Sequence, residues 1–206
     1  MPKQTPNKYN FSLSDYLPAK SIDIVQDMIN STCLKLCLSS PRKTIQGTYK
    51  RASKGKPHII TVNEDLNSYT FLITLLHEFA HLYAWEINRS LRHGMEWKNH
   101  FSVLLHRFIE QEVFPEDIKQ ALLQHMKNIK SSDAKDVNLS RVLQSYDTQK
   151  EHSKEVYLMD LDEKSEFVYN NRCFIKKQLL RTYFLCTEIQ TKRNYRFHPL
   201  AKVLEV

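Results

Sequence analysis

The sequence predicts an α+β protein in which a larger, mostly helical domain is followed by a small β-rich module at the C-terminus. Apolar residues recur with helical spacing in long stretches up to about residue 146, whereas short segments with alternating apolar residues follow residue 155. A chain of 206 residues fits one large domain with a small appendage. Its composition, with 41% hydrophobic and 26% charged residues, is that of an ordinary globular protein.

The chain is expected to begin with a flexible arm and to continue as the larger domain. The arm covers residues 1–14, which are polar and contain proline, and the domain covers residues 15–148. The first elements of the domain are expected to be a helix near 20–36 and strands at 43–51 and 58–63. The second strand, HIITVN, is rich in alternating β-branched residues.

The longest predicted helix follows Asn67 and Ser68, which can cap its N-terminus. Its sequence, SYTFLITLLHEFAHLYAWEI, has a broad apolar face. The segment RSLRHG, at 89–94, should end this helix. Three further helices are then expected, at 95–111, 115–129 and 137–146.

Residues 149–206 are expected to form a charged linker and then a basic β-rich module. The linker is QKEHSKE, at 149–155, and the sequence pattern changes after it. Short strands are expected at 156–161, 166–170, 172–177, 181–189 and 195–200. The pair Asn170-Asn171 suits a tight hairpin turn between the second and third of these strands.

The composition excludes several classes of protein. Only three glycines occur, so a glycine-rich phosphate-binding loop is ruled out, and four cysteines are too few for a disulfide framework. No apolar stretch has the length of a membrane-spanning helix, and the N-terminus lacks the apolar core of a signal peptide. We therefore expect a cytoplasmic protein without a membrane partner. The net charge of +7 permits a nucleic-acid partner without requiring one, and the oligomeric state stays open.

The strongest chemical motif is His77-Glu78-Phe79-Ala80-His81, within the longest predicted helix. His77 and His81 are one helical turn apart, so both imidazoles lie on one face and can reach a single Zn²⁺ ion. Glu78 is adjacent to the first imidazole, where its carboxylate can hold a metal-bound water and accept its proton. The motif therefore predicts a catalytic zinc site with Glu78 as the general base.

A catalytic zinc needs a third protein ligand and one open position. The downstream candidates are Glu86, His93, Glu96, His100 and His106. Glu86 is on the same helix, five residues past His81, and should point away from the metal. His93 is favoured because it follows the helix break, where the chain can double back, and because the adjacent Gly94 permits close approach of the backbone. His100, His106 and Glu96 stay open as alternatives.

The stretches LLHEFAHLYAW and RHGMEWKNHF resemble the SprT-like zinc metallopeptidases, a family that includes the Spartan proteases. The family pattern is HExxH, a variable insert, and then His-Gly-x-x-aromatic. The residues that fall on this pattern are His77, Glu78, His81, His93, Gly94 and Trp97. The resemblance extends from strand 58–63 through helix 95–111. It implies a zincin-like fold, with helices beside a small sheet, in which His77, His81 and His93 bind zinc and Glu78 is the catalytic base.

Many SprT-like proteins end in a zinc ribbon with four cysteines, whereas this chain has two cysteines in the corresponding region. Cys173 and Cys186 are not part of CxxC pairs, and His198 could add only a third ligand. We therefore expect a β-rich module that replaces the ribbon and is held by its own core without a second zinc. Cys33 and Cys37, four residues apart at the end of the first predicted helix, are expected to be core thiols.

The basic residues of the module are candidates for binding nucleic acid. From Lys164 to Val206 the sequence has nine basic and three acidic residues, with seven aromatic residues among them. Such a surface can neutralise phosphates and stack bases, and the resemblance favours DNA, either single-stranded or damaged. The alternative is a solvated basic face over an aromatic core. The candidate contacts are Lys176, Lys177, Arg181, Lys192, Arg193 and Arg196.

Three functions are compatible with these features. The first, which the resemblance implies, is a zinc-dependent endopeptidase that acts on DNA-associated or DNA-crosslinked proteins. The second is a non-catalytic, zinc-binding stress or transcription factor associated with nucleic acid, and the third is a zincin that cleaves small peptides. Glu78 favours an enzyme, since a structural zinc site needs no base, and the basic module argues against small peptides.

Overall fold

The computed structural model describes residues 9–42, 44–129, 136–147 and 155–206. The linker predicted at 149–155 lies outside this part of the chain, except for its last residue. The protein is α+β and divides into two compact units, residues 1–147 and residues 148–206, each with its own sheet. Within the described residues, no helix is both long enough and apolar enough to cross a membrane.

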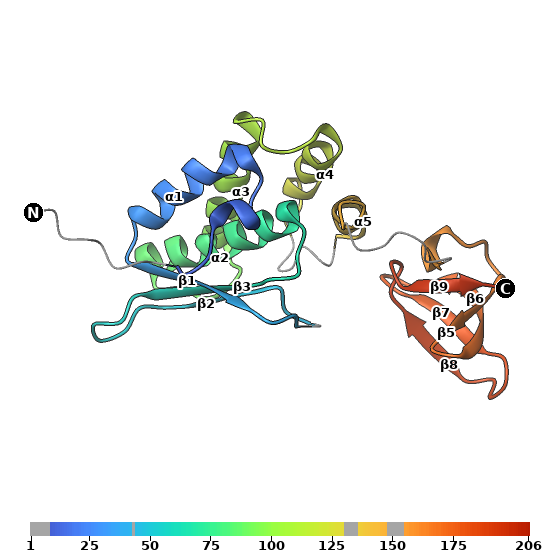
Figure 1. Ribbon diagram of the computed structural model, residues 1–206. Coiled ribbons are helices and arrows are strands. Elements are labelled where there is room, and N and C mark those ends of the chain that lie inside the picture. Colours follow the sequence, from blue (N-terminus) through green and yellow to red (C-terminus); the bar gives the residue numbers. More distant parts are fainter. Residues whose placement is uncertain (1–8, 43, 130–135, 148–154) are drawn as a thin grey trace, which may run out of the picture. The chain divides into compact units, whose positions relative to one another are not determined.

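The first unit is built on a three-stranded sheet with helices packed against one of its faces (Figure 1). The strands are β1 (Leu34–Ser39), β2 (Gly47–Lys50) and β3 (His58–Asn63). β3 is central, parallel to β1 and antiparallel to β2, so β2 is an edge strand. Alternate side chains of β1 and β3 are buried against the helices, namely Leu34, Leu36, Ile60 and Val62. The strand predicted at 58–63 is confirmed, and the strand predicted at 43–51 is shorter than expected.

The longest helix, α2 (Ser68–Asn88), runs through the core of the first unit. Asn67 caps it as predicted, because its side chain accepts a hydrogen bond from the backbone N–H of Thr70 at 2.9 Å. The helix is buried along most of its length, since β2, β3 and a later helix all pack against it. It ends at Arg89, whose left-handed φ of 53° turns the chain back toward the helix.

Four further helices complete the described part of this unit: α1 (Ile22–Asn30), α3 (Met95–Glu110), α4 (Glu116–Met126) and α5 (Val137–Gln144). The last three confirm the helices predicted at 95–111, 115–129 and 137–146, with small differences at their ends. α3 packs against α2 and buries large aromatic side chains there, among them Trp97 and Phe101. This packing places the start of α3 beside the middle of α2.

The helix predicted over 20–36 is wrong beyond residue 30. α1 ends there because the hydroxyl groups of Ser31 and Thr32 donate hydrogen bonds to the carbonyl of Met28. From Leu34 onward buried and more exposed positions alternate, which is typical of a strand. Cys33 is consequently exposed and Cys37 is half-buried on β1, so the expectation of two core thiols is also wrong.

The arm predicted over 1–14 is folded from residue 9 onward, and residues 1–8 lie outside the described part. Tyr9 and Phe11 pack against the core of the first unit, and Leu13 is buried. Two short 3₁₀ turns follow, Leu13–Asp15 and Ala19–Ser21. The apolar side chains at these three positions hold the segment on the unit, although its neighbours are polar.

The second unit, called the module below, is a six-stranded antiparallel sheet with the strand order β4-β9-β5-β6-β7-β8. Its strands are β4 (Glu155–Tyr157), β5 (Glu166–Tyr169), β6 (Arg172–Leu179), β7 (Phe184–Glu188), β8 (Asn194–Phe197) and β9 (Lys202–Glu205). Asn170 and Asn171 have positive φ angles of 49° and 60°, so the predicted hairpin turn is confirmed. β9 is absent from the sequence-based prediction and pairs with both β4 and β5.

The module has its own apolar core, distinct from the core of the first unit. The rings of Phe167 and Phe174 stack in this core with centroids 5.5 Å apart, and Phe184, Leu158 and Val203 are buried around them. The aromatic residues that the sequence places between basic residues therefore serve mainly to fill the inner face of the sheet.

Candidate metal centre

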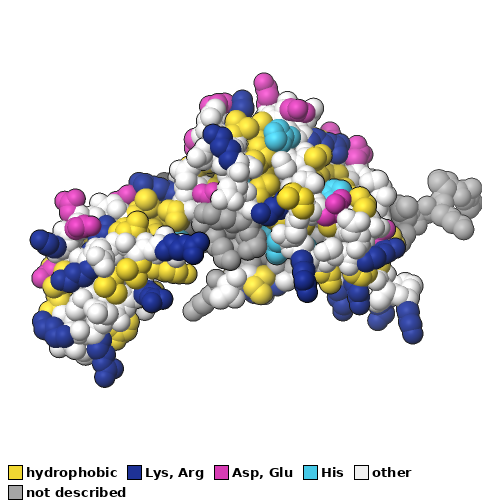
Figure 2. Space-filling model, turned by 180° about the vertical axis from the view of Figure 1, so that it is seen from behind, with side chains coloured by type: hydrophobic (Ala, Val, Ile, Leu, Met, Phe, Trp, Pro, Cys, Tyr) yellow, Lys and Arg dark blue, Asp and Glu magenta, His cyan; other side chains and the backbone are white. Residues whose placement is uncertain are grey.

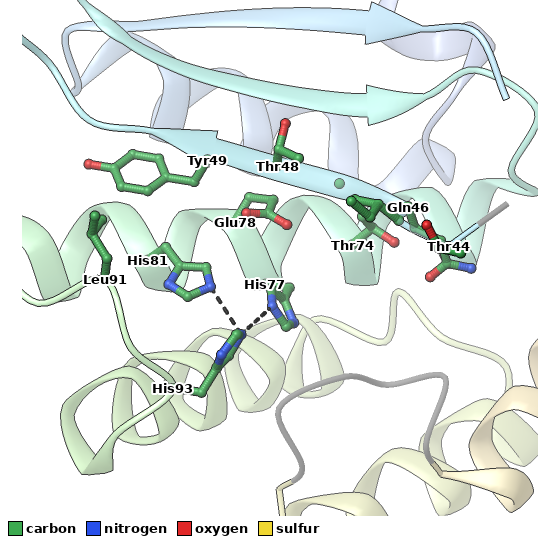
Figure 3. Close-up of a pocket in the computed structure, with 12 residues that line it drawn as sticks. Thr44, Gln46, Thr48, Tyr49, Thr74, His77, Glu78, His81, Leu91 and His93 are labelled. Carbon is green, nitrogen blue, oxygen red and sulfur yellow. Dashed lines mark hydrogen bonds between the residues drawn. The ribbon is translucent and has the colours of Figure 1, made fainter. Parts of the chain in front are cut away.

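Three histidine side chains converge at one point beside α2 (Figure 3). His77 and His81 lie one turn apart on α2, and His93 lies in the turn between α2 and α3. The Nε2 atom of His93 is 3.0 Å from Nε2 of His77 and 3.1 Å from Nε2 of His81. The chain reversal at Arg89 brings His93 back over the helix face that carries the other two imidazoles.

The spacing of the three imidazoles is compatible with a shared tetrahedral zinc ion. Their candidate ligand atoms all lie within 4.8 Å of one another. A tetrahedral ion with Zn–N bonds of about 2.0–2.1 Å would hold its nitrogen ligands about 3.3 Å apart. The nitrogen separations of 3.0 Å and 3.1 Å are close to this value. Three histidines leave a fourth position for water, which is the ligand set of a catalytic zinc site.

The other candidates for the third ligand are engaged elsewhere. Glu86 points away from the cluster, as expected, and its carboxylate lies 3.0 Å from Nε2 of His58. His100 and Glu96 lie 3.5 Å apart on α3, and Nδ1 of the exposed His106 is 3.0 Å from the carbonyl of Ser102. Of the five alternatives, the structure brings only His93 to the two histidines of α2.

Gly94 differs from its expected role. A Cβ atom at this position would meet nothing within 4 Å, so close approach of the backbone is not what the glycine provides. Gly94 instead occupies the N-cap position of α3 with extended backbone angles. The doubling back of the chain depends on the left-handed residue Arg89, five residues earlier.

Burial within the cluster favours the neutral form of His81. His81 is only 8% exposed, and burial, with a smaller contribution from the neighbouring His77 and His93, lowers its pKa to about 3. A neutral imidazole has a free lone pair on one ring nitrogen and can therefore bind a metal ion. The environment thus favours the protonation state that a metal ligand needs.

Trp97 packs against all three histidines of the cluster. This residue is fully buried, and its ring contacts His77, His81 and His93 with centroid separations of 4.6, 5.5 and 4.5 Å. Its indole N–H donates a hydrogen bond of 3.2 Å to the backbone carbonyl of His77. Trp97 is therefore a wall of the site rather than a contact for a ligand in the cleft.

An open cleft of about 430 Å³ lies over the cluster and contains Glu78. Residues 44–49, which comprise part of β2 and the loop before it, form one wall, and α2 forms the other (Figure 3). Glu78 is 6% exposed and points from α2 toward β2. A Cβ atom at Gly47 would lie 2.8 Å from Oε1 of Glu78 and 2.6 Å from Thr74, so only glycine leaves room for the glutamate here.

Tyr49, His58 and Glu86 make a series of polar contacts that begins beside His81. The ring of Tyr49 is nearly parallel to that of His81, with centroids 6.3 Å apart and an interplanar angle of 4°. The hydroxyl of Tyr49 lies 2.7 Å from Nδ1 of the buried His58, whose other nitrogen faces Glu86. Burial, and secondarily the charge of Glu86, raise the pKa of Tyr49. Tyr49 therefore stays protonated and lines the cleft beside His81.

Sequence reasoning does not identify Gly47, Tyr49 or His58 as parts of the site. Gly47 offers one signal in the sequence, because an isolated glycine inside a predicted strand often marks a close approach of another group. The contacts of Tyr49 and His58 depend on the pairing of β2 with β3, and no local sequence motif predicts this pairing.

The described residues of the module form no comparable cluster. Cys173 is exposed on β6 and Cys186 is buried on β7, where burial raises the pKa of its thiol to about 11. Within the described residues of the module, no three potential metal ligands come together.

One of the proposed nucleic-acid contacts, Lys176, is wrong. It is only 3% exposed, because it occupies an inward-facing position of β6. Its ammonium group donates hydrogen bonds to the carbonyls of Met159 and Leu161 and lies 4.2 Å from the ring centroid of Phe184. Burial lowers the pKa of Lys176. This lysine fastens the segment after β4 to the sheet and cannot reach a phosphate.

The other five candidates, Lys177, Arg181, Lys192, Arg193 and Arg196, are exposed. They are dispersed, since Arg181 lies in the β6–β7 connection whereas Lys192 and Arg193 lie in the β7–β8 turn at the other end of β7. Tyr169 and Tyr183 are the aromatic side chains of the module that are classed as exposed, at 39% and 44%. This arrangement favours the alternative of a basic exterior over an aromatic core.

Comparison of the chain with known protein families, with curated proteins and with solved structures found no match.

Proposed function

We propose that this protein is a zinc-dependent metalloendopeptidase of the SprT-like type with a zincin-like core. The observation that carries the proposal is the convergence of three histidine Nε2 atoms at the floor of an open cleft that also contains a buried glutamate. A structural zinc site is closed by four protein ligands, whereas this cluster offers three and faces solvent-accessible space. The packing of α2 between the sheet and α3 supports the zincin-like assignment of the core.

The chemistry follows from the residues around the cleft. His77, His81 and His93 would hold the zinc ion, which when bound polarises a carbonyl group and lowers the pKa of a bound water to about 7. The carboxylate of Glu78 accepts the proton of the attacking water and delivers it to the leaving amine. Gly47 leaves the space that this carboxylate occupies, and the ring of Tyr49 lies parallel to that of His81.

The position of β2 supports a polypeptide as the substrate. β2 is an edge strand of the sheet, and three of its residues, Gly47, Thr48 and Tyr49, line the cleft. An extended peptide can pair with the backbone of an edge strand and thereby lie across the metal site. The resemblance to Spartan proteases adds the proposal that the substrates are proteins bound or crosslinked to DNA.

The second candidate function is a non-catalytic, zinc-binding factor associated with nucleic acid. The observation that favours it is the excess of basic residues, which gives the chain a net charge of +7. It differs from the first function in one testable respect, because it does not require Glu78 to accept a proton.

The test combines zinc analysis with cleavage of casein by the full chain and by two matched variants. Glu78→Gln should retain one zinc per chain and lose at least roughly 100-fold in cleavage rate, since an amide cannot accept the proton. Glu96→Gln makes the same chemical change on α3, outside the cleft, and should retain both zinc and activity. Purified protein without zinc, or full activity in Glu78→Gln, would overturn the proposal, and zinc without any cleavage would support the second candidate.

A further inference from the structure

The sheet of the first unit is made entirely from a segment that has no acidic residue. Residues 28–63 contain seven basic residues and neither aspartate nor glutamate. This segment includes all of β1, β2 and β3. The basic residues are Lys35, Arg42, Lys43, Lys50, Arg51, Lys54 and Lys56, of which Lys43 lies outside the described residues. The charge of the sheet is therefore of one sign.

Strand register places two of these lysines in one row on the outer face of the sheet. Lys35 of β1 and Lys50 of β2 both pair with Ile59 of β3. Neighbouring strands are about 4.8 Å apart, so the two lysines emerge about 10 Å from each other. Thr48 and Thr61 form part of the next row and bring hydroxyl groups to the same face. Lys35 and Lys50 are exposed, whereas the helices cover the opposite face.

The β2–β3 hairpin extends this charge beyond the sheet. Arg51, Lys54 and Lys56 are exposed along a tight turn in which Lys54 and Gly55 have positive φ angles of 29° and 76°. Figure 2 shows Lys and Arg side chains gathered at this end of the first unit, at the lower right of the view. The guanidinium group of Arg51 also lies 4.7 Å from the ring centroid of Trp85 on α2, so the basic surface reaches the helix of the metal centre.

Within the part of the chain that the structure describes, no acidic side chain pairs with the lysines of this surface, at positions 35, 50, 54 and 56. The nearest acid along α2, Glu86, faces His58 and Arg89. The module differs, because residues 155–206 contain seven acidic residues against nine basic ones. The strongest single-sign surface thus belongs to the first unit.

We propose that the outer face of the sheet and its hairpin bind the phosphate backbone of a nucleic acid. This sheet surface is defined by Lys35, Lys50, Arg51, Lys54 and Lys56. Lysines about 10 Å apart with hydroxyl groups beside them suit a chain of phosphates, which accepts hydrogen bonds from Lys, Arg and Thr. A lipid surface fits less well, because the hairpin tip at 52–57, ASKGKP, has no large apolar side chain to insert.

Binding of this kind carries little sequence preference and depends strongly on salt, since it is driven by release of counterions. The proposal specifies the DNA partner in the proposed function, yet it needs neither zinc nor Glu78. It assigns nucleic-acid contact to the catalytic unit itself, next to the cleft, in contrast to the expectation that the module provides most of it.

The experiment compares two variants of the full chain that remove the same number of positive charges. One replaces Lys35, Lys50, Lys54 and Lys56 by Gln, and the matched control replaces Lys177, Arg181, Lys192 and Arg193 by Gln. Fluorescence anisotropy with a labelled single strand and with its duplex measures affinity at several salt concentrations. The sheet variant should bind roughly 100-fold more weakly at low salt, with a salt slope smaller by about 2–3, and the control should change less than about threefold.

Several results would overturn the proposal. These are unchanged affinity in the sheet variant, a loss confined to the control variant, or no binding of wild type to either DNA at low salt. Binding of wild type to phosphatidylserine vesicles but not to DNA, abolished in the sheet variant, would assign the surface to membranes instead. Zinc content and casein cleavage should be unchanged in both variants, so failure of this proposal is distinguishable from failure of the peptidase assignment.

Discussion

The two units use their ionisable side chains in opposite ways. In the first unit, His77, His81 and His93 turn toward one point at the base of an open cleft. In the module, Arg172 bonds to the buried Glu188 at 2.6 Å and to the hydroxyl of Tyr195 at 2.7 Å, and Lys176 bonds to backbone carbonyls. Side chains that converge on accessible space indicate a ligand, whereas side chains bonded among themselves indicate a role in the fold.

This difference has a physical basis in how each set of residues is positioned. The imidazoles of α2 share a face because a helix repeats every 3.6 residues, whatever surrounds it. On a strand, a shift of one residue moves a side chain from one face of the sheet to the other. Basic residues counted along the module therefore include both exposed positions and the buried Lys176.

The largest effect is expected from the third histidine. His93→Ala should lower zinc affinity by more than about 100-fold, because the ion would lose one of three protein ligands. His100→Ala removes an imidazole of the same unit that pairs with Glu96 instead, and it should retain zinc. Zinc content after dialysis against a weak chelator measures both. If His93→Ala and His100→Ala retained zinc equally well, the convergence of the three histidines would not mark a metal site.

The next effect concerns Gly47, which lies against Glu78, the proposed catalytic base. Gly47→Ala should lower casein cleavage about 10–100-fold with zinc retained, since the new methyl group would displace the carboxylate of Glu78. Gly94→Ala is the matched control, because a Cβ atom there meets nothing within 4 Å. Its activity should stay within about twofold of wild type. An active Gly47→Ala enzyme would mean that Glu78 does not need its present position.

Removal of a bound metal ion should lower the unfolding temperature of the first unit and leave that of the module unchanged. A ligand present at 100 times its dissociation constant stabilises a protein by about 2.7 kcal/mol, which corresponds to about 5–10 °C for a unit of this size. The two tryptophans, Trp85 and Trp97, both belong to the first unit, so tryptophan fluorescence reports its unfolding alone. A chelator should lower this midpoint in wild type and leave it unchanged in His93→Ala.

The smallest effect is expected at low pH in the module. The hydrogen bonds from Arg172, and then from Thr191, lower the pKa of Glu188 to about 2. Because this pKa lies below that of an unfolded glutamate, about 4.3, the carboxylate stabilises the module fully above that pH and loses its effect as the pH falls toward 2. Hydrogen exchange in β6 and β7 should accelerate over this range in wild type. In Arg172→Gln the acceleration should be weaker, and identical profiles would contradict a structural role for the pair.

Much of the first unit could be predicted from its sequence because its signals are local. Asn67 caps α2, the apolar face and the HExxH spacing lie within the helix, and each of these signals acts over one or two turns. β1 could not be separated from α1, since a short apolar run fits a buried strand and a helix equally. β9 was missed because its last residues pair with strands some 40 residues earlier.

The same distinction applies to the site. His77, Glu78, His81 and the turn that carries His93 follow from spacing along the chain, and the structure brings these histidines together. The wall formed by Gly47 and Tyr49 depends on how β2 pairs with β3 and packs on α2. Such contacts join segments about 30 residues apart, so they cannot be predicted from any single stretch of sequence.

The hydrogen bond from the indole of Trp97 to the carbonyl of His77 couples the start of α3 to the candidate metal centre. α3 begins two residues after His93, and its first turn is clamped to the same helical segment that carries the other two histidines. Any ion held by the three imidazoles would therefore favour the docked state of α3, and by linkage a docked α3 would raise the affinity for the ion by the same factor. Amide protection at the start of α3 should rise and fall with metal occupancy, although no residue of that helix touches the ion.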